Sequence, residues 1–346
     1  MSSLKKLAPG IILCLTIATP AWFLGKTFPI IGSPVFGILF GMLLTIAFPK
    51  LTSTSLKTPS LGVEDGIKYT SKKLLQYAII LLGFEMNLYN ILKVGGQSLF
   101  VMLFTLSAAF ITAYVVGKYL KLGTNTTILI GVGTSICGGS AIAATAPVIK
   151  ASEEDVAHAI STIFLFNIIA VFIFPALGHL LGMSDLGFGM WAGTAINDTS
   201  SVVAAGAAWS SAAGNNTALA FATVVKLTRT LMIVPITLAL ALYTSKQSKL
   251  SSDTSEFKLS KVFPWFVIGF VATAMLNTFI NFPDVISITL VQTGKFVIVM
   301  AMSAIGLNTH LKKLISNGLK PIFLGLCTWF AVASVSIIVQ LTMKLW

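Results

Sequence analysis

Gly-Thr-Ala-Ile-Asn-Asp-Thr-Ser-Ser-Val-Val-Ala-Ala-Gly, residues 193–206, interrupts an apolar stretch at 187–213 with an amide, a carboxylate and hydroxyl groups. A second apolar stretch, 124–150, is interrupted at residues 133–144, which read Gly-Thr-Ser-Ile-Cys-Gly-Gly-Ser-Ala-Ile-Ala-Ala. When Gly133 is aligned with Gly193, the Gly, Thr, Ile, Ser and final Ala of the two motifs coincide. The sequence therefore contains one kind of break, repeated, inside two segments that are otherwise apolar.

The composition of the whole chain is that of a membrane protein. Of its 346 residues, 55% are hydrophobic and 10% are charged, against about 25% charged in a typical soluble domain. This composition excludes an ordinary cytoplasmic enzyme and a disordered chain. The formal net charge is +12, but the lysines are scattered in loops with no basic stripe between aromatic residues. We therefore expect a lipid bilayer as the surrounding medium and no nucleic-acid partner.

The pattern of apolar runs predicts an all-α polytopic membrane protein. If the two interrupted stretches cross the bilayer there are eleven spans, and if they are re-entrant hairpins there are nine full crossings. We favour broken over intact helices for both, in an inverted-repeat arrangement. The other runs are long enough to span, at about 20 residues each, and the first is expected to be a retained helix. The predicted full spans are 7–25, 33–49, 74–92, 97–117, 156–180, 217–243, 262–280, 287–307 and 320–343.

The distribution of lysine predicts the orientation. With the N-terminus inside, sixteen lysines fall in inside segments and only Lys26, Lys93 and Lys344 fall outside. Because inside loops of membrane proteins are enriched in Lys and Arg, this split predicts a cytoplasmic N-terminus. The segments 51–73 and 244–258, rich in Ser, Thr and Lys, are then inside linkers.

The chain is expected to form one transmembrane domain over residues 1–346. Within it we expect the first two spans, in 1–60, to belong to a scaffold, and residues 64–243 to form a core that carries both breaks. The C-terminal spans occupy 262–346. The sequence does not distinguish an elevator motion of the core from a rocking motion.

The residue types at the breaks predict a binding site. Non-helical backbone is tolerated at membrane depth only inside protein or beside water. Glycine lets backbones approach closely, and Ser or Thr caps the half-helix that starts at each break, whose N–H groups favour an anion. The alternative is small-residue packing between helices. The candidate ligands at the breaks are Ser135, Cys137, Gly138, Gly139, Ser140, Asn197, Thr199 and Ser200.

Ionisable residues inside apolar spans indicate a structural or functional role, because inserting each one at the bilayer centre costs about 2.5–3.5 kcal/mol on insertion scales. Lys226 and Arg229 are three residues apart and so share one helix face. With Asp198 they leave a surplus of positive charge that suits an anion, although an ion pair between Asp198 and either cation is the alternative. We expect Lys295 to extend to the interface from near a helix end, and Asn167 to hydrogen-bond an interrupted segment.

These motifs, followed by Val-Lys-Leu-Thr-Arg at 225–229, resemble the bacterial sulfate exporter family over essentially the whole chain. The resemblance implies a plasma-membrane protein of the cation/proton antiporter and anion transporter superfamily, with inverted repeats and discontinuous helices that meet at the midplane. Members of the family often carry His where this chain has Asn197. A proton relay at that position is therefore not expected here.

The favoured function is secondary transport, as an exporter, of a small anionic solute such as sulfate or an organic sulfonate. Asp198 is the candidate coupling site for H+ or Na+, and no other cofactor or metal is expected. One alternative is an ion-translocating membrane subunit of a larger complex, and another is an intramembrane enzyme with Cys137 as nucleophile and His158 as base. A homo-oligomer is left open.

Overall fold

The computed structural model describes residues 2–29, 31–48, 63–247, 265–280, 282–309 and 318–346. Within these ranges every regular element is a helix, so the all-α expectation is confirmed for this part of the chain. By length and composition, six of the described helices could cross a membrane. They are Lys6–Thr27, Leu88–Tyr119, Glu153–Leu180, Thr217–Leu240, Val285–Leu307 and Leu319–Met343.

The prediction of nine full spans is too high for the described residues. The segments 33–49 and 262–280 form helices of 15 and 16 residues, α2 (Ser33–Ala47) and α15 (Trp265–Ile280). Both helices are apolar. A perpendicular crossing needs a longer helix, of roughly 20 residues. The third missing span, 74–92, is divided between two helices.

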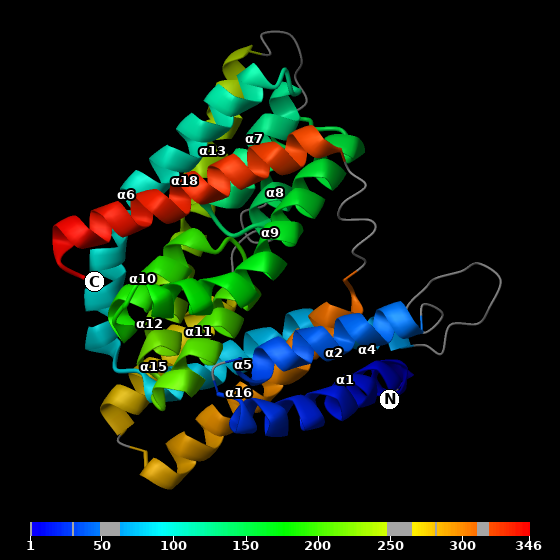
Figure 1. Ribbon diagram of the computed structural model, residues 1–346, viewed down its shortest axis with the longest axis vertical. Helices are drawn as coiled ribbons and strands as arrows, with labels where there is room; N and C mark the ends of the chain where they lie inside the picture. The colour runs from blue at the N-terminus through cyan, green and yellow to red at the C-terminus, as the bar shows by residue number, and fades with distance from the viewer. Residues whose placement is uncertain (1, 30, 49–62, 248–264, 281, 310–317) are drawn as a thin grey trace.

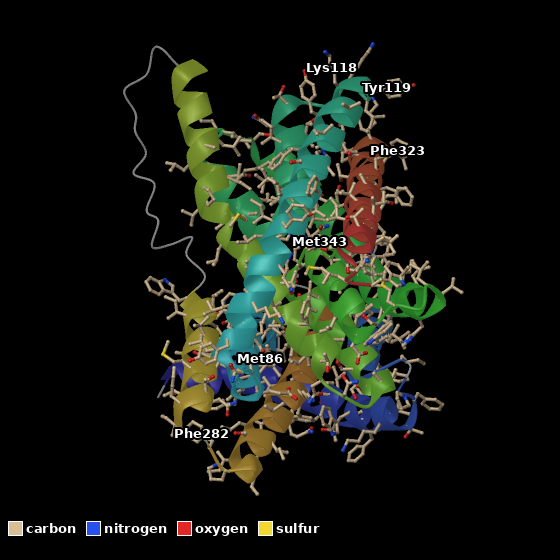
Figure 2. All side chains as sticks on the ribbon, turned by 90° about the vertical axis from the view of Figure 1, so that its left-hand side faces the viewer. Met86, Lys118, Tyr119, Phe282, Phe323 and Met343 are labelled. Atoms are coloured by element: carbon tan, nitrogen blue, oxygen red, sulfur yellow. The ribbon has the colours of Figure 1, made fainter. Side chains whose placement is uncertain are left out.

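The division of 74–92 occurs at Met86 and Asn87, which are both extended. Helix α5 (Leu75–Leu82) passes into the short 3-10 turn η2 (Gly83–Glu85), and α6 (Leu88–Tyr119) starts two residues later. The Asn87 side chain caps α6, because its Oδ1 accepts a hydrogen bond of 2.8 Å from the Tyr89 amide. Figure 2 shows α6 rising from Met86 to Lys118 and Tyr119 at its far end.

The predicted loop between 92 and 97 is absent, since α6 runs through it as one helix of 32 residues. Lys93, which we placed in an outside loop, therefore lies in a helix. At the other end, α4 (Val63–Tyr69) and the π-helical turn η1 (Thr70–Leu74) lead directly into α5. Residues 63–73 are thus helical rather than linker, while 51–62 and 248–258 lie outside the described residues.

Figure 1 shows the helices gathered into two bundles. In the first bundle α2 packs on α16, α1 packs on α2 and α4, and α5 packs on α15 and α16. Residues 63–82, which we expected in the core, thus pack against the first spans. The members of this bundle are α1 (Ser2–Thr27), α2, α4, α5, α15 and α16 (Asp284–Leu307).

The second bundle contains both interrupted segments. Helix α6 packs along α18, α7 and α12, and α10 and α11 both pack on α12. The two bundles meet where α11 lies against α2 and α16, and where α6 contacts α15. The helices of the second bundle are α6, α7 (Thr124–Ser135), α8 (Gly139–Thr145), α9 (Glu153–Leu180), α10 (Asp185–Ala195), α11 (Thr199–Ala213), α12 (Thr217–Leu231), α13 (Ile233–Gln247) and α18 (Leu319–Met343).

The long helices present apolar side chains outwards. On α6, Leu103 is 62% exposed and Ile111 is 63% exposed, with Phe100 and Phe104 on the same helix also exposed. An outer surface of this kind is stable in contact with lipid and unfavourable in water. The packing therefore supports a membrane protein, as the composition indicated.

Candidate functional site

Each of the two motifs contains the boundary between two helices. Helix α7 ends at Ser135 and α8 begins at Gly139. Helix α10 ends at Ala195 and α11 begins at Thr199. At the first break Gly138 has a φ of +70°, and at the second Asp198 caps α11 by accepting a 3.0 Å hydrogen bond from the Ser200 amide. Left-handed glycine and an acidic cap are thus the local causes of the two helix starts.

Lys226 of α12 joins the two breaks through its ammonium group. Its Nζ donates to the carbonyl of Ile136 at 2.8 Å, to that of Ile196 at 3.0 Å, and to that of Asn197. The side chain is fully buried. One cation therefore uses its three donors on carbonyls from both interrupted segments.

Arg229, one turn further along α12, also joins the two breaks, through its guanidinium group. Its Nε donates to the Ser135 carbonyl at 2.6 Å, and its two terminal nitrogens donate to the carbonyls of Thr194 and Thr134. This side chain is also fully buried. The planar fork of arginine suits a position where several acceptors must be reached at fixed angles.

Apart from that of Asn197, the carbonyls held by these two cations belong to the C-terminal ends of α7 and α10 and their C-caps. The last carbonyls of a helix have no partner within it and carry roughly half a negative charge. Lys226 and Arg229 therefore satisfy and neutralise both helix ends at once. Asp198 interacts electrostatically with Lys226 but forms no direct ion pair, because within the described chain no nitrogen of either cation lies within 4.0 Å of its carboxylate.

Asn167 of α9 connects with the second break, as the sequence predicted. Its Oδ1 accepts hydrogen bonds of 3.2 Å from the amides of Asn197 and Asp198. Among the described residues its Nδ2 has no hydrogen-bond partner, and neither has the side-chain amide of Asn197, although both residues are buried. Unpartnered buried amides are costly. These amides leave hydrogen-bonding capacity unused at the second break.

The remaining candidate residues lie at the N-terminal ends of α8 and α11, which follow the breaks. Ser140 is exposed, and Gly139, Asp198 and Thr199 are half-buried, whereas Ser200 is buried and donates its hydroxyl to Asp198. The starts of α8 and α11 are thus more open than the two buried cations.

Two candidates face inwards. The hydroxyl of Ser135 donates to the Val132 carbonyl at 3.1 Å, so this residue offers the site only its backbone. Cys137 is buried. Its supposed base His158 has Nε2 at 3.5 Å from Glu154, and its Nδ1 has no partner in the described part of the chain. The enzyme alternative stays a prediction without a thiol–imidazole contact to support it.

Comparison with known proteins places the chain among bacterial membrane proteins. Residues 9–325 match the family described as Conserved hypothetical protein 698. The chain belongs to this family. It is 49% identical to a UPF0324 membrane protein of Fusobacterium nucleatum subsp. nucleatum, with 96% of both chains covered. It is also 49% identical to one of Streptococcus pyogenes serotype M18, with 100% of both covered, and 47% identical to one of Streptococcus mutans serotype c, with 97% covered.

These matches confirm the coarse part of the predicted resemblance. The Conserved hypothetical protein 698 family is a family of bacterial membrane proteins, as the names of these relatives state. The names mention neither sulfate nor the antiporter superfamily, so neither follows from the comparison.

Two threonines that complete the site were not among the predicted residues. Thr134 and Thr194 occupy equivalent positions in the two motifs, and each gives a carbonyl to Arg229. Their hydroxyls both meet α18, Thr134 with Thr328 at 3.4 Å and Thr194 with Ser336 at 2.7 Å. The alignment of the two motifs already matched both threonines, but their shared contact with α18 requires the fold.

Replacing Gly138 by alanine is expected to lower the stability of the protein by about 1–3 kcal/mol, the cost of a strained backbone conformation. Gly138 has a φ of +70° and a ψ of −128°. This combination is accessible almost only to glycine. Gly139 is the matched control, because a methyl group there meets only Phe164, at 3.5 Å, and Gly139 lies inside helix α8. Thermal unfolding of both variants in detergent tests this, and equal midpoints would contradict the role given to the backbone of Gly138.

Proposed function

We propose that this protein is a secondary transporter of a small anion, coupled to H+ or Na+ and working as an exporter. The single observation that carries the proposal is the pair of fully buried cations, Lys226 and Arg229, that bridges both breaks without a described carboxylate in contact. Buried ionisable groups in membrane helices mark solute or ion pathways.

The charges around the breaks favour an anion over a cation. Two helix C-termini contribute about half a negative charge each, and two N-termini contribute the same amount of positive charge, so the dipoles cancel. Lys226 and Arg229 then add two positive charges and Asp198 removes one. An anion bound among these groups would restore neutrality, whereas a cation alone would add to the excess.

We further propose that α7–α8 and α10–α11 are two discontinuous membrane helices of an inverted repeat. Matched positions in the two motifs give equivalent contacts, since Thr134 and Thr194 each bond Arg229 and an α18 hydroxyl. In transporters with inverted repeats, such half-helices meet near the midplane and place the solute between them.

In the proposed site the solute lies at the starts of α8 and α11. The backbone amides at Gly138 and Gly139 and the hydroxyls of Ser140, Thr199 and Ser200 are the ligands. Asp198, which caps α11, is the site of the coupling ion. The unpartnered amides of Asn197 and Asn167 are the further donors that a sulfate or sulfonate oxygen would engage.

The two bundles suggest how the solute could cross. Both breaks lie in the second bundle, and among the described helices α11 and α6 make its main contacts with the first. A displacement of the second bundle against the first would expose the site to alternate sides of the membrane. An elevator and a rocking motion both fit this division.

A ligand screen by thermal unfolding tests the proposed substrate class. An anion present at about 100 times its Kd stabilises the native state by about 2.7 kcal/mol, which raises the unfolding temperature by several degrees. We expect sulfate or an alkylsulfonate to give this shift in purified protein. A shift with Na+ alone, and none with sulfate, sulfonates or carboxylates, would favour an ion-translocating subunit.

A further inference from the structure

A cavity of about 320 Å³ with a largely apolar lining lies between the two bundles, away from the breaks. Its walls come from α1, α2 and α16 of the first bundle and from α11 and the loop after it in the second. The floor is formed by buried residues, among them Pro34, Leu219 and Val299, and the rim by polar ones, among them Ser211 and Gln292. A ligand in this cavity would touch both bundles.

Among its described lining residues the cavity has two lysines and no carboxylate. Lys26 extends from the end of α1 and lies over the Trp22 ring, with its Nζ 5.3 Å from the ring centroid. Lys295 lies in the middle of α16, where the sequence had led us to expect it near a helix end. Lys295 is therefore not near a helix end, and its Nζ donates to Asn216 of the opposite bundle.

Lys295 has N–H donors that are free to bind a ligand. Its contact with the Asn216 Oδ1 uses one proton of the ammonium group, which carries three. Two carboxylates lie near the cavity without lining it. Asn216 donates through its Nδ2 to Glu85, which also interacts electrostatically with Lys295, and Asn215 donates to Asp185 at 2.8 Å. The lysines are therefore the charged groups among the described lining residues of the cavity.

From these contacts we infer that the cavity between the bundles binds an oxyanion group, held by Lys26 and Lys295. The ligand chemistry is a sulfate, sulfonate, phosphate or carboxylate head, with neutral donors from Ser211 and Gln292 around it. Its source is either a free solute or the phosphate of an anionic lipid. This inference rests on the residues that line the cavity and is independent of the proposed transport through the breaks.

Labelling of a cysteine placed in the cavity tests the inference without measuring transport. The variant is Ser211→Cys, made with Cys327→Ser, which removes the one native cysteine of intermediate exposure and leaves the buried Cys14 and Cys137. We expect a negatively charged methanethiosulfonate to react about tenfold faster than a positively charged one, because two cations attract it. Lys26→Gln and Lys295→Gln should each reduce that ratio, whereas Lys118→Gln, at the far end of α6, should not (Figure 2).

Protection experiments identify the source of the oxyanion. Millimolar sulfate that slows labelling in detergent supports a free solute, and slowing only in vesicles with phosphatidylglycerol, compared with phosphatidylcholine, assigns the site to lipid. If the ratio of the two labelling rates is unchanged in both lysine variants, the inference is overturned. It is also overturned if neither sulfate nor lipid slows labelling. A variant at the breaks that loses anion flux but keeps the labelling rates at residue 211 would bear on the proposed transport and leave the cavity inference unaffected.

Discussion

Replacing Arg229 by alanine is expected to abolish anion flux in proteoliposomes and to destabilise the protein. The change removes the donors of three backbone carbonyls, at Thr134, Ser135 and Thr194. Each buried acceptor left without a donor costs about 1–3 kcal/mol. The same change removes one of the two positive charges that we assign to anion binding, so stability and flux should fall together.

Arg229→Lys separates these two effects. It retains the positive charge and three donors but not the planar fork, so the three carbonyls are reached with poorer geometry. We expect a smaller loss of thermal stability than with alanine, and anion-dependent stabilisation that persists. Lys118→Ala, at an exposed helix end, is the control and should change neither quantity. Undiminished anion flux in Arg229→Ala would contradict the assignment of Arg229 to the anion site.

The positions of the breaks could be predicted because their causes are local. Gly138 permits a left-handed backbone, and Asp198 followed by Thr199 and Ser200 is a helix cap by residue type alone. The presence of two buried cations on one face of α12 follows equally from the spacing of Lys226 and Arg229. The core of the candidate site was therefore visible in the sequence.

The partners of the cations could not be predicted from the sequence. Lys226 and Arg229 reach carbonyls of helices that are distant in the chain, and a backbone carbonyl has no residue type that reveals it. Simple charge complementarity suggested Asp198 as the partner instead. The true partners follow from the unsatisfied helix ends, which exist only once both helices are known to stop there.

The misplaced start of α6 has a different physical cause. The sequence at 93–96 has a Lys followed closely by two glycines. This is a typical loop pattern in water, where solvent satisfies the exposed backbone. In an apolar environment the backbone must satisfy itself, so the helix continues through the glycines. The chain breaks earlier instead, at Asn87, whose side chain caps the new helix.

Replacing Asp198 by asparagine is expected to uncouple transport from the cation gradient while leaving the fold intact. Asparagine caps a helix about as well as aspartate, and its Oδ1 could keep the hydrogen bond from the Ser200 amide. The structural cost is therefore small. The electrostatic change is large, because the local excess of positive charge beside Lys226 and Arg229 rises from one to two.

Anion binding should accordingly become tighter by about tenfold or more in Asp198→Asn, since a like-charged group near the anion is removed. Release then slows, and H+ or Na+ has no carboxylate to occupy. We expect sulfate or sulfonate accumulation to lose its response to an imposed gradient, whereas Glu154→Gln, an exposed carboxylate on α9, keeps that response. If accumulation in Asp198→Asn still follows the gradient, the coupling ion binds elsewhere. If the affinity for the anion falls, the argument that excess positive charge at the site binds an anion is contradicted.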